Sequence, residues 1–203
     1  VEAAVQDVTS EAGWERLIGD VLARHGRLDV MVNNAGIARI ASVEDTTLDV
    51  WRLTMAVNVE GVFLVTKAAI GAMKERGGAI VNVASIAGLH PQPSMGVYCV
   101  SKAAVLMLTQ ALAAELAPDN IQVNALAPGY IKTRFSQALW DNPALNRALL
   151  AQIPQRRLAA PDQLTGIALY LAAPASSYTT GAVFVVDGGH LVGNPIDPGS
   201  IQV

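Results

Sequence analysis

Short apolar runs alternate with longer segments of helical periodicity along most of this chain. The apolar runs are rich in Val, Ile and Ala and are bounded by turn-forming residues, as buried strands are. They predict strands at residues 3–5, 28–32, 79–84, 121–127 and 182–186. Strands that alternate with helices are typical of a parallel sheet covered by helices. The pattern therefore predicts an α/β fold.

Helical periodicity is clearest near the start of the chain. From Trp14, apolar residues recur at i, i+3, i+4, i+7 and i+8, which places them on one stripe of a helix that ends at Gly26. A long second helix is expected to begin at Thr46 or Thr47 and to run to the two glycines at 77–78. Two more helices are predicted at about residues 96–117 and 162–172.

The segment between residues 128 and 161 has no clear period. Pro143, Pro154 and Pro161 interrupt it, which favours a mobile flap over a site at about residues 130–160. The 203 residues, 52% of them hydrophobic, are long enough to bury one sizeable core. We therefore expect residues 1–203 to form a single domain.

Composition narrows the function. Charged residues make up 15% of the chain, the net charge is −3, and basic residues form no run, so nucleic acid is not expected as a partner. Polar residues interrupt the longest apolar stretch, so no membrane span is expected. The single cysteine, Cys99, excludes an internal disulfide framework and favours the cytoplasm. A mean hydropathy of +0.36 favours a homo-oligomer that covers apolar surface.

Polar and turn-forming residues follow three of the predicted strands. They are the Asn33-Asn34-Ala35-Gly36 loop, Ser85 and Pro128-Gly129. In open parallel sheets the ligand crevice lies outside the carboxyl ends of the strands, so these residues point to one edge. Each of them alone is also an ordinary loop former.

Tyr98 and Lys102 are four positions apart at the start of a predicted helix, so both lie on one face. An ammonium beside a phenol is expected to lower the pKa of the phenol towards the working pH of a general acid or base. The pair by itself is more typical of a surface tyrosine near a solvated lysine. The order of motifs along the chain favours a catalytic role for the pair, because Asn58 and Ser85 precede it and Pro128-Gly129 follows.

In that order and spacing the chain resembles the short-chain dehydrogenase/reductase family, along nearly its whole length. The matching pieces are Asp7-Val8, Asn33-Asn34-Ala35-Gly36, Asn58, Ser85, Tyr98-x-x-x-Lys102, Pro128-Gly129 with Ile131 and Thr133, and Asp187-Gly188-Gly189. The resemblance implies a Rossmann-type doubly wound parallel sheet. It also implies an enzyme that moves hydride between NAD or NADP and a small alcohol or carbonyl substrate.

By that resemblance, four residues would be catalytic. Tyr98 would exchange a proton with the substrate oxygen, and Ser85 would hydrogen-bond the same oxygen. Lys102 would lower the pKa of Tyr98 and bind the nicotinamide ribose. Asn58 would hold a water that links Lys102 to solvent.

The resemblance also implies the cofactor contacts, to which Tyr98 and Lys102 belong. Asp7 and Val8 would meet the adenine, and Asn33, Asn34, Ala35 and Gly36 would run beside the adenosine ribose, where glycine permits close approach. Pro128, Gly129, Ile131 and Thr133 would border the nicotinamide. Asp187-Gly188-Gly189 would form a turn. Apolar and ring residues of the flap and loops either line the substrate pocket or pack the flap: His90, Met95, Tyr130, Phe135 and Trp140.

The chain departs from the family pattern at its front. The Gly-rich turn that cradles the pyrophosphate does not occur, and matching Asp7 to its family position implies that roughly 50 residues, a strand-helix-strand-helix unit, are missing. The unit's strands would lie beside residues 3–5 and 28–32. We therefore expect an N-terminally truncated chain that by itself aggregates or binds dinucleotide poorly, and a full-length parent that is an active dimer or tetramer.

Two other functions stay open. One is a catalytically silent fragment or binding protein of the same fold, because the phosphate loop is absent. The other is an epimerase or dehydratase of the extended relatives, which share the Tyr/Lys pair. The choice between NAD and NADP also stays open, since the residues that discriminate them follow strands that this sequence does not contain.

Overall fold

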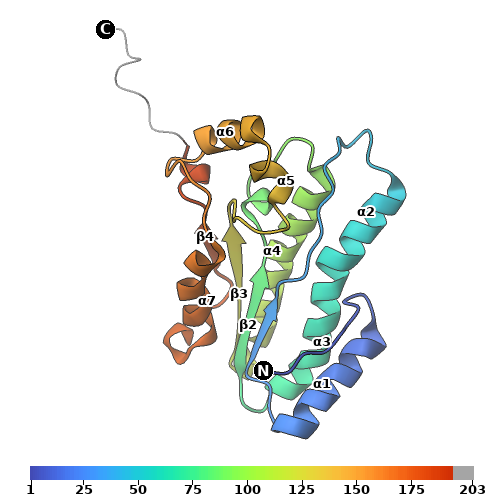
Figure 1. The fold of residues 1–203 in the computed structure, drawn as a ribbon. Coiled ribbons are helices and arrows are strands. Elements are labelled where there is room, and N and C mark those ends of the chain that lie inside the picture. The colour runs from blue at the N-terminus through green and yellow to red at the C-terminus, as the bar shows by residue number, and fades with distance from the viewer. Residues whose placement is uncertain (194–203) are drawn as a thin grey trace.

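Four parallel strands form the centre of the protein (Figure 1). The computed structural model describes residues 1–193, so the expectation that one domain reaches residue 203 concerns residues outside the described part. The sheet has the order β1-β2-β3-β4, and every neighbouring pair is parallel. Its strands are β1 (Val30–Asn33), β2 (Gly78–Val83), β3 (Ile121–Pro128) and β4 (Val183–Val186).

Helices cover both faces of this sheet (Figure 1). One face packs α3 and α4 around Ile80 and Val123, and α1 lies outside α3. The other face packs α7 against Val81 and Leu126. Successive strand residues such as Ile80 and Val81 point to opposite faces, and here both faces are buried. This confirms the Rossmann-type doubly wound fold. The helices are α1 (Glu11–His25), α2 (Leu48–Met55), α3 (Gly61–Met73), α4 (Gly96–Leu116), α5 (Gln137–Trp140), α6 (Pro143–Gln152) and α7 (Thr165–Ala172).

The predicted strand at residues 3–5 is wrong. No residue before Val30 belongs to a strand, and Val5 is fully exposed. A strand needs a hydrogen-bonded neighbour, and the described residues offer none beside this segment. β1 is correspondingly an edge strand, with β2 as its one neighbour, and the Val32 side chain is 54% exposed.

The long predicted second helix is divided by a π-helical turn, Ala56–Glu60. The amide of Gly61 bonds the carbonyl of Ala56, five residues back, instead of four. The extra residue rotates the chain between α2 and α3, and Asn58 in the turn becomes completely buried. Periodicity alone could not show this turn, because its flanks are both helical.

The flap contains more regular structure than its sequence pattern suggested. Two helices too short to show a period, α5 and α6, occupy its middle. The Asn142 side chain accepts hydrogen bonds from the amides of Ala144 (3.0 Å) and Leu145 (3.2 Å), and Pro143 is the first residue of α6. Pro143 therefore begins a helix, a position that suits proline, and does not interrupt one.

Two stretches, residues 48–73 and 96–119, are long and apolar enough to cross a membrane by length and composition alone. Helices α3 and α4 within them contribute buried residues to the sheet-packed cores. The core helices of a soluble α/β protein pass the same test, so this finding is weak evidence for a membrane span.

A series of buried, hydrogen-bonded polar side chains runs from β1 through β2 to α4. The Asn33 amide donates to Asn82 Oδ1 (2.7 Å), and the Asn82 amide donates to Thr109 Oγ1 (2.9 Å). All three residues are buried. Their mutual bonds replace the water that such groups would otherwise need.

Replacing Asn82 with Ala is expected to lower the free energy of unfolding by about 1–3 kcal/mol, because Asn33 and Thr109 each lose a buried partner. Urea denaturation measures the change. The matched control is Gln122→Ala on the neighbouring strand, whose side chain bonds Asn120 at the surface. An Asn82 effect as small as the control's would show that this series of side chains adds nothing to stability.

Candidate active site

The residues that follow β1, β2 and β3 meet the start of α4 at the carboxyl edge of the sheet. Gly36, Ser85 and Gly129 come from three loops, and Tyr98 lies in the first turn of α4. The flap helices α5 and α6 lie beyond the same ends of the strands (Figure 1). This is the edge at which ligands bind in open parallel sheets.

The Ser85 side chain lies close enough to the Tyr98 phenol to lower its pKa. Ser85 caps the 3-10 turn Ile86–Gly88, and its oxygen accepts from the amide of Ala87 at 3.1 Å. That turn lies directly on α4, since a side chain at Gly88 would stand 2.7 Å from the Lys102 backbone. The absence of a side chain at Gly88 thus allows the serine to reach the tyrosine.

The Tyr98 phenol behaves differently from the sequence-based expectation. Burial raises its pKa above the ordinary value of 10; the Ser85 hydrogen bond lowers the pKa and the Cys99 thiol raises it, both by less. Lys102 Nζ lies 5.7 Å from the Tyr98 ring centroid, and it donates to the Val83 carbonyl (2.8 Å). The expected lowering by Lys102 is therefore wrong in this structure: desolvation of the phenol dominates.

Lys102 is itself buried, with 4% of its surface exposed. Burial lowers the pKa of its ammonium to about 8. A side chain at Gly36 would stand 3.5 Å from Lys102 Nζ, so the bare glycine leaves the space beside the lysine open. Gly36 was expected at one edge of the sheet, and the structure brings Lys102 to the same place.

Asn58 is tied to the loop after β1. Its Oδ1 accepts from the Ile37 amide (2.8 Å), and its Nδ2 donates to the Ile37 carbonyl (2.9 Å) and to Ser101 Oγ (2.9 Å). Both N–H groups of the side chain are thus used by the protein. A water relay through Asn58 stays a proposal, and one Oδ1 lone pair or the backbone would have to hold the water.

The expected adenosine side has a small cavity of about 70 Å³. Asp7, beside it in sequence, is exposed; its carboxylate accepts from the Thr9 amide (2.9 Å) and hydroxyl (2.8 Å), which lowers its pKa. The Asn33 side chain is buried, and its Nδ2 donates to Asn82 Oδ1. The cavity is lined by Val8, Trp14, Val32, Asn33, Asn34, Ala35, Val57, Gly61, Val62 and Val65.

The expected nicotinamide side begins where β3 ends at Pro128. Gly129 lies against Asp187, because a side chain there would stand 2.7 Å from the Asp187 Cα. Ile131 pairs with Ala159 across the base of the flap. The Thr133 carbonyl accepts from the Trp140 indole (3.2 Å), so Trp140 packs within the flap.

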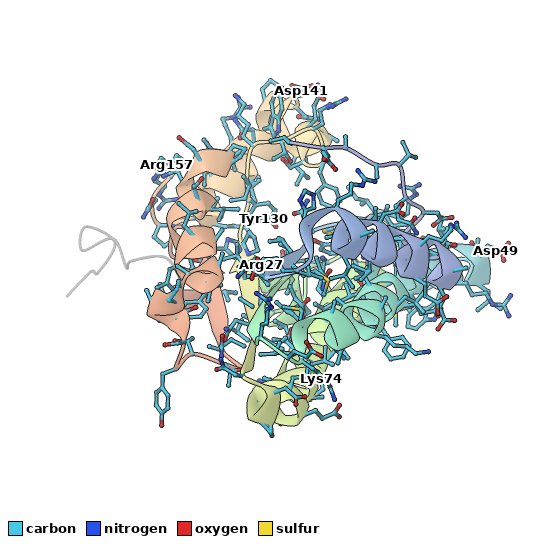
Figure 2. All side chains as sticks on the ribbon, turned by 90° about the horizontal axis from the view of Figure 1, so that it is seen from below. Arg27, Asp49, Lys74, Tyr130, Asp141 and Arg157 are labelled. Carbon is cyan, nitrogen blue, oxygen red and sulfur yellow. The ribbon has the colours of Figure 1, made fainter. Side chains whose placement is uncertain are left out.

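A further group of side chains lies beside Tyr98. The Tyr130 hydroxyl donates to Gln92 Oε1 (3.1 Å), the Cys99 thiol accepts from the Gln92 amide (3.3 Å), and the Phe135 ring lies 6.2 Å from the Tyr98 ring. Tyr130 lies near the centre of the molecule, whereas Asp141 in the flap lies at its periphery (Figure 2).

The sequence singled out Tyr130 and Phe135 but missed Gln92 and Cys99. Cys99 adjoins Tyr98 in sequence, which was the available signal. The remaining pocket candidates contribute less: His90 is exposed, and Met95 forms a bridge with Ala41.

Replacing Gly36 with Ala is expected to weaken NADH or NADPH binding about tenfold, because the new methyl fills the space beside Lys102 that a ribose would need. Fluorescence titration measures the dissociation constant. Gly71→Ala on α3 is the matched control, since a side chain there meets nothing within 4 Å. Equal affinity in both variants would exclude a cofactor beside Gly36.

The chain is similar to known dehydrogenases and reductases. The family model described as enoyl-(acyl carrier protein) reductase matches residues 1–190. Dehydrogenase/reductase SDR family member 4 of Bos taurus is 42% identical over 179 residues, which are 87% of this chain and 64% of that protein. Cyclopentanol dehydrogenase of a Comamonas species is 42% identical over 185 residues, 91% of this chain and 74% of that protein.

The fold matches solved structures equally well. The crystal structure of a gluconate 5-dehydrogenase from Burkholderia cenocepacia in complex with NADP and tartrate has a TM-score of 0.90 and 38% identity, covering 93% of this chain and 74% of that one. Against the Bos taurus, Sus scrofa and Homo sapiens relatives, this chain spans somewhat less than two thirds of their length.

Proposed function

Because this chain belongs to the short-chain dehydrogenase/reductase family, we propose that it carries the catalytic centre of an NAD(P)-dependent oxidoreductase that interconverts an alcohol and a ketone. The observation that carries the proposal is that the Ser85 side chain interacts with the buried Tyr98 phenol, one helical turn from the buried Lys102. Folding alone does not require a phenol, a hydroxyl and an ammonium to meet at the carboxyl edge of the sheet.

Each side chain has a distinct task in this reaction. Tyr98 exchanges a proton between its phenol oxygen and the substrate oxygen. Ser85 donates to the same substrate oxygen and stabilises the charge that develops on it. Lys102 supplies positive charge beneath both groups, and the Val83 carbonyl holds its ammonium in place. The dinucleotide, when bound, supplies or accepts the hydride.

The residues present fit a dinucleotide in part. The bare Gly36 beside Lys102 admits a ribose, and the small cavity at Val8, Asn34 and Ala35 lies where the adenosine end is expected. Pro128, Gly129, Ile131 and Thr133 would border the nicotinamide end. The neighbour from Burkholderia cenocepacia holds NADP, and either NAD or NADP suits the residues described.

We propose a secondary alcohol or ketone with apolar bulk as the substrate. The Phe135 ring beside Tyr98 offers an apolar surface, and Tyr130 and Gln92 add polar groups at its margin. The names of two relatives, cyclopentanol dehydrogenase and trans-4-hydroxycyclohexanecarboxylate dehydrogenase, favour a ring-bearing alcohol.

We further propose a homo-oligomer, dimer or tetramer, in the cytoplasm. Exposed apolar side chains on α2, α3 and α4 support self-association, because a second copy would cover them. They include Leu53, Phe63, Val100 and Met107. The free thiol of Cys99 supports a reducing compartment.

A second candidate is a catalytically silent binding protein of the same fold. Turnover separates this alternative from the enzyme.

The test uses the native protein, as the cell produces it, with NAD or NADP and a set of cyclic and open-chain secondary alcohols. We expect reduced cofactor to form at 340 nm with at least one alcohol, and the product to be the matching ketone. If the substrate is neither oxidised nor reduced overall and the product is its epimer or its dehydrated form, the result would favour an epimerase or dehydratase. Cofactor binding without turnover of any substrate would favour the silent binding protein.

A further inference from the structure

A serine between the two proposed catalytic residues of α4 is completely buried. Ser101 has an exposed fraction of 0%. Its Oγ donates to the Tyr98 carbonyl (2.8 Å) and accepts from Asn58 Nδ2 (2.9 Å). A serine hydroxyl within a helix often bonds a carbonyl three or four residues back, but here it also receives a bond from another segment.

That second bond joins three parts of the chain. Asn58 lies in the π-helical turn, and its side chain bonds both the amide and the carbonyl of Ile37 in the loop after β1. Ser101 Oγ is the group through which this side chain reaches α4. We call Ile37, Asn58 and Ser101, with the three hydrogen bonds that join them, the loop–helix junction.

The loop–helix junction lies against the proposed reacting groups. A side chain at Gly36 would stand 3.4 Å from Asn58 Oδ1 and 3.5 Å from Lys102 Nζ, so the loop, the π-turn and the lysine converge there. Ser101 is the residue before Lys102, and its hydroxyl bonds the carbonyl of Tyr98. A shift of Asn58 would therefore move the loop relative to both catalytic side chains.

We propose that Ser101 is a positioning residue. Its hydroxyl fixes the Asn58 turn and the Gly36 loop to the first turn of α4, and so holds Tyr98 and Lys102 at the correct distance from the cofactor-binding loop. The proposal rests on the proposed function. A purely structural role would affect only the stability of the protein. A positioning role also affects the rate, because small displacements of reacting groups reduce rates strongly.

The same helix provides a matched control. Thr109 is also completely buried, donates its hydroxyl to a carbonyl one turn back (Val105, 2.8 Å) and accepts from a buried amide (Asn82 Nδ2, 2.9 Å). It lies two turns beyond Ser101 and bonds neither the loop nor Tyr98. Removing its hydroxyl deletes the same kinds of hydrogen bond at a distance from the chemistry.

The experiment compares Ser101→Ala with Thr109→Val in the native protein. We expect Ser101→Ala to lower kcat about 10- to 100-fold at saturating substrate and cofactor, and to shift the midpoint of the kcat–pH profile. Thr109→Val should lower the melting temperature but leave kcat and its pH profile unchanged. If both variants lose stability and both keep the wild-type kcat and pH profile, Ser101 is only structural and the proposal is overturned.

A second measurement does not depend on turnover. Hydrogen exchange of the Ile37 amide, which donates to Asn58 Oδ1, should be faster in Ser101→Ala than in Thr109→Val. Equal exchange rates in the two variants would overturn the positioning role of Ser101. Absence of alcohol turnover in the native protein would contradict only the proposed function, and the exchange measurement would still test the loop–helix junction. If Ser101→Ala does not fold, Ser101→Cys keeps a group of similar shape that accepts weakly, and takes its place in both measurements.

Discussion

Replacing Tyr98 with Phe is expected to lower kcat about 10²- to 10⁴-fold, the range that a general acid or base contributes. Phenylalanine keeps the ring and its contact with Phe135 and removes only the phenol oxygen that would exchange a proton with substrate. The dissociation constant of the reduced cofactor should change much less than kcat. Initial rates and fluorescence titration in the native protein measure the two quantities.

Tyr170→Phe is the matched control. Its hydroxyl also makes a side-chain hydrogen bond, to Thr179 Oγ1 at 2.8 Å, but on α7, across the sheet from α4. This control should keep the wild-type kcat. Retention of activity in Tyr98→Phe would contradict the proton-transfer role and leave Ser85 as the group to test next.

Replacing Lys102 with Met is expected to lower kcat about 10²- to 10³-fold and to weaken cofactor binding, because a positive charge beneath the reacting oxygen is lost. The same variant should be at least as stable as the wild type at pH 7. Burial of the ammonium costs on the order of 3 kcal/mol at that pH, given a pKa of about 8 against an ordinary 10.5. Loss of the bond to the Val83 carbonyl offsets about 1 kcal/mol of the gain.

The pH dependence identifies this gain. The folded protein binds the Lys102 proton more weakly than the unfolded chain, so the penalty is complete below pH 8 and disappears as pH rises from 8 to 10.5. The contribution of Lys102 to the free energy of unfolding of the wild type therefore rises between pH 8 and 10.5, and Lys102→Met lacks this rise. Urea denaturation at several pH values measures it. Lys74→Met, at the periphery beside Asp119 and far from Tyr130 (Figure 2), controls for the lost charge.

The sequence predicted the sheet well and the non-strand segments less well. The four runs that became β1 to β4 are apolar, the central strands β2 and β3 are largely buried, and the boundaries shifted by no more than two residues. The predicted strand at residues 3–5 was wrong because so short a run forms a strand only when a neighbouring strand pairs with it. Pro143 was misread because its effect depends on whether a helix begins or continues there, which the Asn142 cap decides.

The candidate site shows the same division. That Ser85, Tyr98, Lys102 and Gly36 share one edge could be predicted, since the carboxyl ends of parallel strands meet there. The direction of the Tyr98 pKa could not, because desolvation depends on how tightly the surrounding loops close. Ser101 and Gln92 were missed because their partners are 43 and 38 positions away in sequence, and no local pattern marks them.

The bridge between Ile131 and Ala159 joins the two ends of the flap at its base, and the Gln155 amide bonds the Gly188 carbonyl after β4. The proposed reacting groups, by contrast, are anchored in β2, α4 and the π-turn. Substitutions between residues 132 and 158 can therefore remodel substrate preference while the proton-transfer geometry stays fixed. Directed evolution for new alcohols should accumulate its changes in that stretch and leave the sheet edge untouched.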